Sequence, residues 1–174
     1  MQGRSCAMAQ FIKSPICKAL WTHNCHDPDR KYPDRHGIGY FSITGNFQKE
    51  QRNELEKLII AEIGSSNAGT YHFKSDSNGG TDVKFKAKET IRGRDGKDII
   101  QRPPVMYKGE KYNDSFEHAD VHILFTPKLY KAYNKCSLIL RGVEIVELAD
   151  DSVQTAEEHD IALLKQLGAM NGDA

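Results

Sequence analysis

Two apolar runs in the second half of the chain show the clearest alternation of hydrophobic and polar positions. From Val121 to Phe125 every second residue is a bulky apolar one, and residues 138–146 repeat this two-residue rhythm. The pattern predicts two antiparallel β-strands. Arg141-Gly142 interrupts the second run, and a glycine at this position predicts a bulge that lets a sheet coil towards a closed barrel.

Other parts of the sequence predict further elements. They are strands at 11–21, 38–47 and 82–94, an amphipathic helix at 49–63, a short extended piece at 71–74, a strand confined to the flanks of Pro103-Pro104 within 98–107, a basic and aromatic turn at 108–112, and a helix at 156–167. Residues 22–37 are polar and rich in proline and aspartate, which predicts a loop. In the strand at 82–94, the residues expected to face the core are Val83, Phe85, Ala87 and Ile91.

These elements predict a mainly β protein, a five-stranded Greek-key barrel of the OB-fold type with one amphipathic helix and an acidic C-terminal tail. A length of 174 residues suits one domain. We expect residues 8–151 to form that domain and residues 152–174 to form the tail. Residues 1–7 precede a second methionine and are interpreted as a cloning remnant.

Charge is unevenly distributed although the chain is neutral as a whole. Residues 1–146 hold 23 of the 24 Lys and Arg against 17 acids, a net charge of +6, and the remainder carries −6. A basic body with an acidic tail is typical of nucleic-acid-binding proteins, and an acidic solvated helix is the alternative. Irregularly spaced cysteines, no long apolar run and no signal peptide predict a reduced, soluble, intracellular protein without a membrane span.

Lysines interleaved with tyrosines suggest where a nucleic-acid strand would bind, because ammonium groups pair with phosphates and flat rings stack on bases. The connector at 126–135 has this mixture, and the strand at 82–94 places three lysines on one face, for which a merely solvated face is the alternative. The candidate DNA-binding residues are Lys13, Arg35, Tyr40, Lys84, Lys86, Lys88, Arg92, Arg94, Arg102, Tyr107, Lys111, Tyr112, Lys128, Tyr130, Lys131, Tyr133 and Lys135.

Other chemistry has weaker support. The residue types that bind zinc occur at Cys17, His23, Cys25, His26 and His36, but the pair spacing of zinc sites is missing. Three aspartates at positions 27, 29 and 34 resemble a magnesium site, yet the neighbouring Arg30 and Arg35 are expected to pair with them. No nucleophile elbow or phosphate-binding glycine loop is present. We therefore expect no metal, no cofactor and no enzymatic activity.

Four segments together resemble a known family. They are MAQFIKSPICKA, GYFSITGNF, DVKFKAKET and VHILFTPKLYKAYNKCSLILRGVEIVELAD. In this order they are similar to the replicative single-stranded DNA-binding protein of short-tailed, T-seven-like bacteriophages, over most of residues 8–151. Two positions depart from the family pattern: Lys88 replaces an aromatic residue, and the tail ends at Ala174 without a terminal aromatic.

The resemblance implies an OB-fold that covers single-stranded DNA without sequence preference and promotes annealing in DNA replication, recombination and repair. It also implies a homodimer, a location in the cytoplasm of an infected bacterium, and an acidic tail that contacts the phage DNA polymerase and helicase-primase. An RNA-binding OB-fold protein and a non-enzymatic phage structural or assembly protein are the alternatives.

Overall fold

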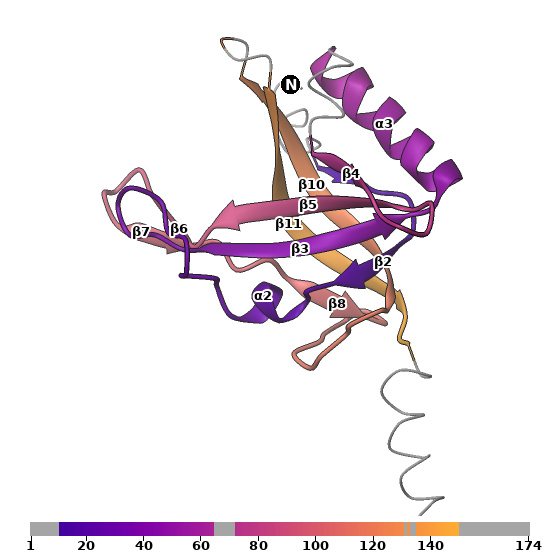
Figure 1. The fold of residues 1–174 in the computed structure, drawn as a ribbon. Coiled ribbons are helices and arrows are strands. Elements are labelled where there is room, and N and C mark those ends of the chain that lie inside the picture. Colours follow the sequence, from indigo (N-terminus) through magenta and orange to yellow (C-terminus); the bar gives the residue numbers. More distant parts are fainter. Residues whose placement is uncertain (1–10, 65–71, 131, 133–134, 150–174) are drawn as a thin grey trace, which may run out of the picture.

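Five strands close into a barrel in the computed structural model, which describes residues 11–64, 72–130, 132 and 135–149. They are β2 (Cys17–Leu20), β3 (Tyr40–Phe47), β5 (Thr81–Lys88), β10 (Asp120–Tyr130) and β11 (Lys135–Glu147). Their order around the barrel is β2-β3-β5-β11-β10, and β10 pairs again with β2 (Figure 1). Only the β5–β11 pairing among these is parallel. The predicted mainly β, OB-type barrel is confirmed.

The long β10–β11 hairpin confirms the two predicted antiparallel strands and the bulge. Leu124 lies opposite Gly142 whereas Phe125 lies opposite Leu140, so that Arg141 is left without a partner residue. The predicted connector at 126–135 is wrong in its extent. β10 continues to Tyr130 and β11 begins opposite it, because both chains keep pairing beyond their apolar runs.

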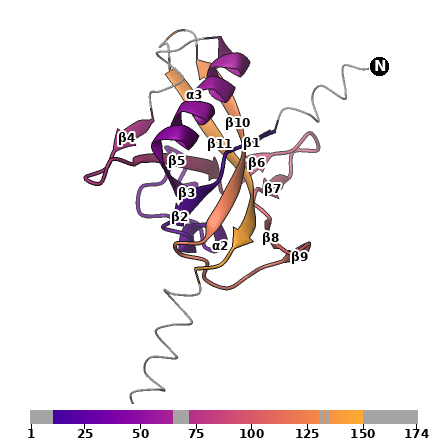
Figure 2. The ribbon, with the colours of Figure 1, turned by 90° about the vertical axis from the view of Figure 1, so that its right-hand side faces the viewer.

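Alternation along the strands builds the core. Phe85 of β5 is fully buried, with its ring centroid 5.0 Å from that of Phe125 and 6.4 Å from that of Phe47. Helix α3 (Lys49–Ile63) packs against β10 and β3 and has the predicted bounds (Figure 2). Its buried residues are Leu55 and Ile59, four residues apart on one face, and it ends at Gly64 with the left-handed φ of 73° that favours glycine.

The remaining elements of the described chain are short. They are β1 (Ile12–Lys13), α2 (His23–His26), β4 (Phe73–Ser75), β6 (Thr90–Arg92), β7 (Asp98–Ile100), β8 (Val105–Tyr107) and β9 (Glu110–Lys111). The Pro-Pro pair separates β7 from β8 as predicted, since proline provides no amide donor for a sheet.

Three expectations are corrected. The strand at 11–21 is divided into β1 and β2, with Pro15 between them. The loop at 22–37 contains the helical turn α2. The strand at 82–94 is divided at Glu89 into β5 and β6, and β6 pairs with β7 rather than with β3. As a result Ile91 does not face the core and is 42% exposed.

The cloning remnant at 1–7, the tail at 152–174 and its helix at 156–167 lie outside the described residues. Among the residues described, no helix is long and apolar enough to span a membrane.

Candidate nucleic-acid interface

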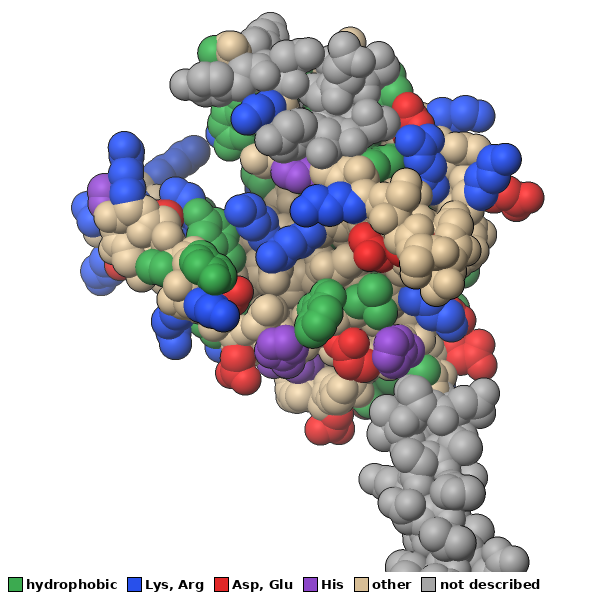
Figure 3. Space-filling view, viewed as in Figure 1, with side chains coloured by type: hydrophobic (Ala, Val, Ile, Leu, Met, Phe, Trp, Pro, Cys, Tyr) green, Lys and Arg blue, Asp and Glu red, His purple; other side chains and the backbone are tan. Residues whose placement is uncertain are grey.

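A groove of about 830 Å³ runs along the outer face of the barrel over β3 and β5, and its far wall comes from β10 and β11. Its cations are Lys74, Lys84, Lys86, Lys88, Lys128 and Arg141. Its aromatic side chains are Trp21, Tyr40 and Tyr130. Lysine and arginine side chains gather over β5 beside a hollow in the surface (Figure 3). The groove therefore combines positive charge with exposed rings.

The lysines of strand β5 point into the groove because the opposite face of the same strand packs in the hydrophobic core. Val83, Phe85 and Ala87 are buried, so the alternate residues Lys84, Lys86 and Lys88 are exposed. Pairing with β3 then sets the neighbours of each lysine.

Tyr40 of β3 lies opposite Lys88 and diagonal to Lys86. Its ring centroid is 4.6 Å from Lys86 Nζ, a cation–π distance. The two groups together offer a ring for a base and an ammonium for the adjacent phosphate.

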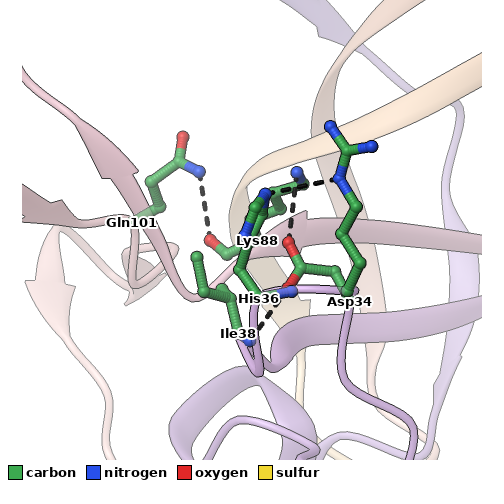
Figure 4. Close-up of polar contacts among 6 residues, drawn as sticks. Asp34, His36, Ile38, Lys88 and Gln101 are labelled. Carbon is green, nitrogen blue, oxygen red and sulfur yellow. Dashed lines mark hydrogen bonds and ion pairs between the residues drawn. The ribbon is translucent and has the colours of Figure 1, made fainter.

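Lys88 has an acidic partner within the protein. Its Nζ lies 3.3 Å from Asp34 Oδ2, and the Asp34 side chain is only 9% exposed (Figure 4). Asp34 Oδ1 accepts hydrogen bonds from the backbone N–H of Ile38 at 2.9 Å and of His36 at 2.8 Å. These contacts hold the pKa of Asp34 below its usual value. The hydrogen bond from Ile38 N–H contributes most, followed by the bond from His36 N–H and by the charge of Lys88. Lys88 is therefore partly neutralised, whereas Lys86 faces a neutral ring.

Trp21, the residue after β2, presents a large ring to the groove. It is 64% exposed and has a left-handed φ of 58°, which is uncommon for a bulky side chain. The backbone on both sides is fixed: Thr22 N–H donates to Glu117 Oε1 at 2.5 Å, and His118 N–H donates to Ala19 O at 2.7 Å. The strained conformation is thus imposed by its neighbours, as is common at functional sites.

His72 contributes a titratable group to the same groove. Its Nε2 lies 2.5 Å from the backbone oxygen of Cys136 on β11. Burial, with smaller contributions from Lys86 and Lys74, lowers the pKa of His72 below its usual value. The lowered pKa favours the neutral imidazole in the free protein.

At the tip of the β10–β11 hairpin, Lys128 Nζ lies 5.4 Å from the ring centroid of Tyr130, which is 42% exposed. Both side chains line the groove. The other two predicted residues of this region, Lys131 and Tyr133, lie outside the described residues.

Comparison with known proteins gives structural matches alone, because no family model and no curated protein matches the sequence. The single-stranded DNA-binding protein gp2.5 of bacteriophage T7 superposes with a TM-score of 0.57 at 15% identity, covering 82% of this chain and 94% of that one. The single-stranded DNA-binding protein of bacteriophage Enc34, solved with single-stranded DNA, superposes with a TM-score of 0.53 at 15% identity, covering 80% and 87%. The fold is that of these phage proteins.

The structure brings six of the predicted residues together in the groove: Tyr40, Lys84, Lys86, Lys88, Lys128 and Tyr130. It places others outside the groove lining: Lys13, Arg35, Arg92, Arg94, Arg102, Tyr107, Lys111, Tyr112 and Lys135. Several of these make contacts with other residues of the protein. Lys13 Nζ pairs with Glu144 at 3.1 Å, and the rings of Tyr107 and Tyr112 pack edge to face with centroids 5.7 Å apart.

Sequence reasoning missed groove residues that lie in other segments, namely Trp21, His72, Lys74, Ile91, Gln101 and Arg141. Trp21 carried a usable signal, since tryptophan is enriched at interfaces and this one is followed by a polar loop. The others carried none, because their position depends on how β4, the β6–β7 hairpin and β11 meet around the barrel.

The residues considered above as metal ligands make other interactions in the fold. Cys17 and Cys25 are buried in the core, and burial raises the pKa of Cys25 to about 12. Within the described part of the chain, no group of three or more possible ligands could hold a metal ion. The expected pairing of Arg30 with the loop aspartates is wrong, because Arg30 pairs with Glu89.

Proposed function

We propose that this chain binds single-stranded DNA along the groove over β3 and β5, without sequence preference. The observation that carries the proposal is the groove itself, which Lys84, Lys86 and Lys128 line together with the rings of Trp21 and Tyr40. A cationic track supplies the phosphate contacts, and rings accept any base because every base has an apolar face.

The groove is a poor fit for duplex DNA or for reading a base sequence. Its cations and rings lie on one curved barrel face, and rings can stack only on bases that are unpaired. The Enc34 protein, which has this fold, is known in complex with single-stranded DNA. Both points favour a single strand as the ligand.

The wider role that we propose is in phage DNA replication, recombination and repair, where such a protein protects and anneals single strands in the cytoplasm of the infected bacterium. Homodimer formation and contacts with the phage DNA polymerase and helicase-primase through residues 152–174 belong to the same proposal. The support for these parts is the shared fold and the −6 charge that follows residue 146.

Titration of intrinsic fluorescence tests the binding proposal, since Trp21 is the sole tryptophan of the sequence and lines the groove. Oligo-dT should quench its emission, duplex DNA should not, and salt should weaken binding. Lys84→Ala should reduce the salt dependence, and Lys57→Ala on the exposed side of α3 is the matched control.

Three results would contradict the proposal. Equal quenching by duplex and single strand would mean that the rings do not stack on bases. Stronger binding of oligo-U than of oligo-dT would favour an RNA ligand, because only RNA offers the 2′-hydroxyl. Absence of binding to every oligonucleotide at low salt would favour the structural or assembly protein.

A further inference from the structure

The β6–β7 hairpin exposes three large apolar side chains. Ile91 is 42% exposed, Ile99 50% and Ile100 67%. The hairpin projects from the end of β5, away from the barrel (Figures 1 and 2). Exposed isoleucines concentrated on so short an arm are a sign of a contact surface.

The pairing register sorts these isoleucines onto two faces. Ile91 lies opposite Ile99, while Thr90 lies opposite Ile100. Directly opposed residues share a face and adjacent residues alternate, so Ile91 and Ile99 lie together and Ile100 points to the other side. A Cβ on Gly93 would come within 3.0 Å of Ile99 Cδ1, so Ile99 extends over the glycine. We call the face formed by Ile91 and Ile99 the hairpin shelf.

The hairpin shelf continues the groove, because Ile91 is itself one of the groove residues. The base of the hairpin is fixed to the barrel on both strands. Glu89 N–H donates to Gly39 O, Gln101 N–H donates to Glu89 O at 2.9 Å, and Gln101 Nε2 donates to Lys88 O at 3.0 Å. The orientation of the hairpin shelf relative to the β5 lysines is therefore set by the fold.

We propose that the hairpin shelf binds unpaired bases of the DNA strand where it leaves the barrel groove at the Lys88 end. This inference rests on the proposed function and extends it to a second subsite. An apolar isoleucine face covers bases without reading their edges, which keeps binding independent of sequence. The exposed cations Arg94 and Lys97 at the hairpin turn supply charge for the accompanying phosphates.

A length series of oligo-dT separates the two subsites. Short strands, about 6 nucleotides long, would fill the barrel groove, and strands of about 16 nucleotides would also reach the hairpin shelf. Ile99→Ser should weaken binding of the longer strand about fivefold and leave binding of the shorter strand unchanged, since an apolar contact is lost only there. Ile91 lines both the groove and the hairpin shelf, so Ile91→Ser should weaken binding of both lengths. Ile100→Ser, on the other face of the same hairpin, is the matched control and should bind both lengths as the wild type does.

Melting temperatures and light scattering complete the test. All three variants should melt as the wild type does, because each residue is exposed. If Ile99→Ser binds the longer strand as tightly as the wild type does, the proposal that the hairpin shelf binds bases is overturned, while the groove proposal stays intact. An equal loss for Ile100→Ser, or a change of oligomeric state without DNA, assigns the isoleucines to protein contacts and also overturns it. A wild type that binds neither length refutes the proposed function itself.

Discussion

Asp34 restrains one of the three groove lysines, and removing its charge should strengthen DNA binding. Asp34→Asn keeps the side-chain oxygen that accepts the N–H groups of His36 and Ile38, so the loop conformation is preserved. The substitution removes the negative charge 3.3 Å from Lys88 Nζ. Lys88 then becomes available to a phosphate.

The expected magnitude follows from counterion release. One additional phosphate contact steepens the slope of log K against log salt by about 0.7 for a single strand. Over a fourfold range of salt this corresponds to a change of about 2.6-fold in affinity. The assay is a fluorescence titration with oligo-dT at four or more salt concentrations, from about 50 to about 200 mM.

Two controls separate local release of Lys88 from a general gain of positive charge. Asp29→Asn changes the net charge equally and, like Asp34, leaves an oxygen for a loop amide, in this case Lys31 N–H at 2.9 Å. It should leave the slope unchanged. In a Lys88→Ala background, Asp34→Asn should lose its effect. An unchanged slope in Asp34→Asn, or the same increase in Asp29→Asn, would refute the pairing argument.

Three further predictions follow from the groove and the core. Trp21→Ala should reduce single-strand affinity by about 1 to 3 kcal/mol in a titration that follows a labelled oligo-dT, with the melting temperature unchanged because the ring is 64% exposed; a lowered melting temperature would instead make Trp21 a packing residue. Binding by the wild type should strengthen from pH 7 to pH 5 more than binding by His72→Gln, since a bound phosphate raises the lowered pKa of His72 and binding takes up a proton at pH values between the free and the bound pKa; equal pH profiles would contradict this. Phe85→Ala should destabilise the fold by about 3 to 5 kcal/mol in urea unfolding, because Phe85 is fully buried.

The regular elements were predictable where burial imposes a period on the sequence. Helix α3 has its predicted bounds because its buried residues recur every four positions and a glycine follows it. The bulge at Arg141 was predictable because Gly142 interrupts an otherwise continuous apolar strand. Each of these signals is local, so a single stretch of sequence contains all of it.

The limits of β5 could not be predicted in this way. The alternation of lysines suggested that the strand continues to residue 94, yet the ladder ends at Lys88. Glu89 makes the last hydrogen bond on the β3 side, from its N–H to Gly39 O, and its carboxylate pairs with Arg30, whereas from Thr90 onward the chain pairs with β7. Gly39 and Arg30 both belong to the loop that precedes β3. The side on which Ile91 lies therefore depends on residues that no local pattern connects to it.

The same reasoning applies to the charges of the site. In the sequence Lys84, Lys86 and Lys88 are equivalent positions on one strand, and they were predicted to act alike. Pairing of β5 with β3 places the ring of Tyr40 beside Lys86, and the loop before β3 places the carboxylate of Asp34 beside Lys88. A cation next to a ring remains free to pair with a phosphate, whereas a cation next to a carboxylate must first give up that partner. Periodicity in the sequence identifies the basic face, but the fold determines how much of its charge a DNA strand can use.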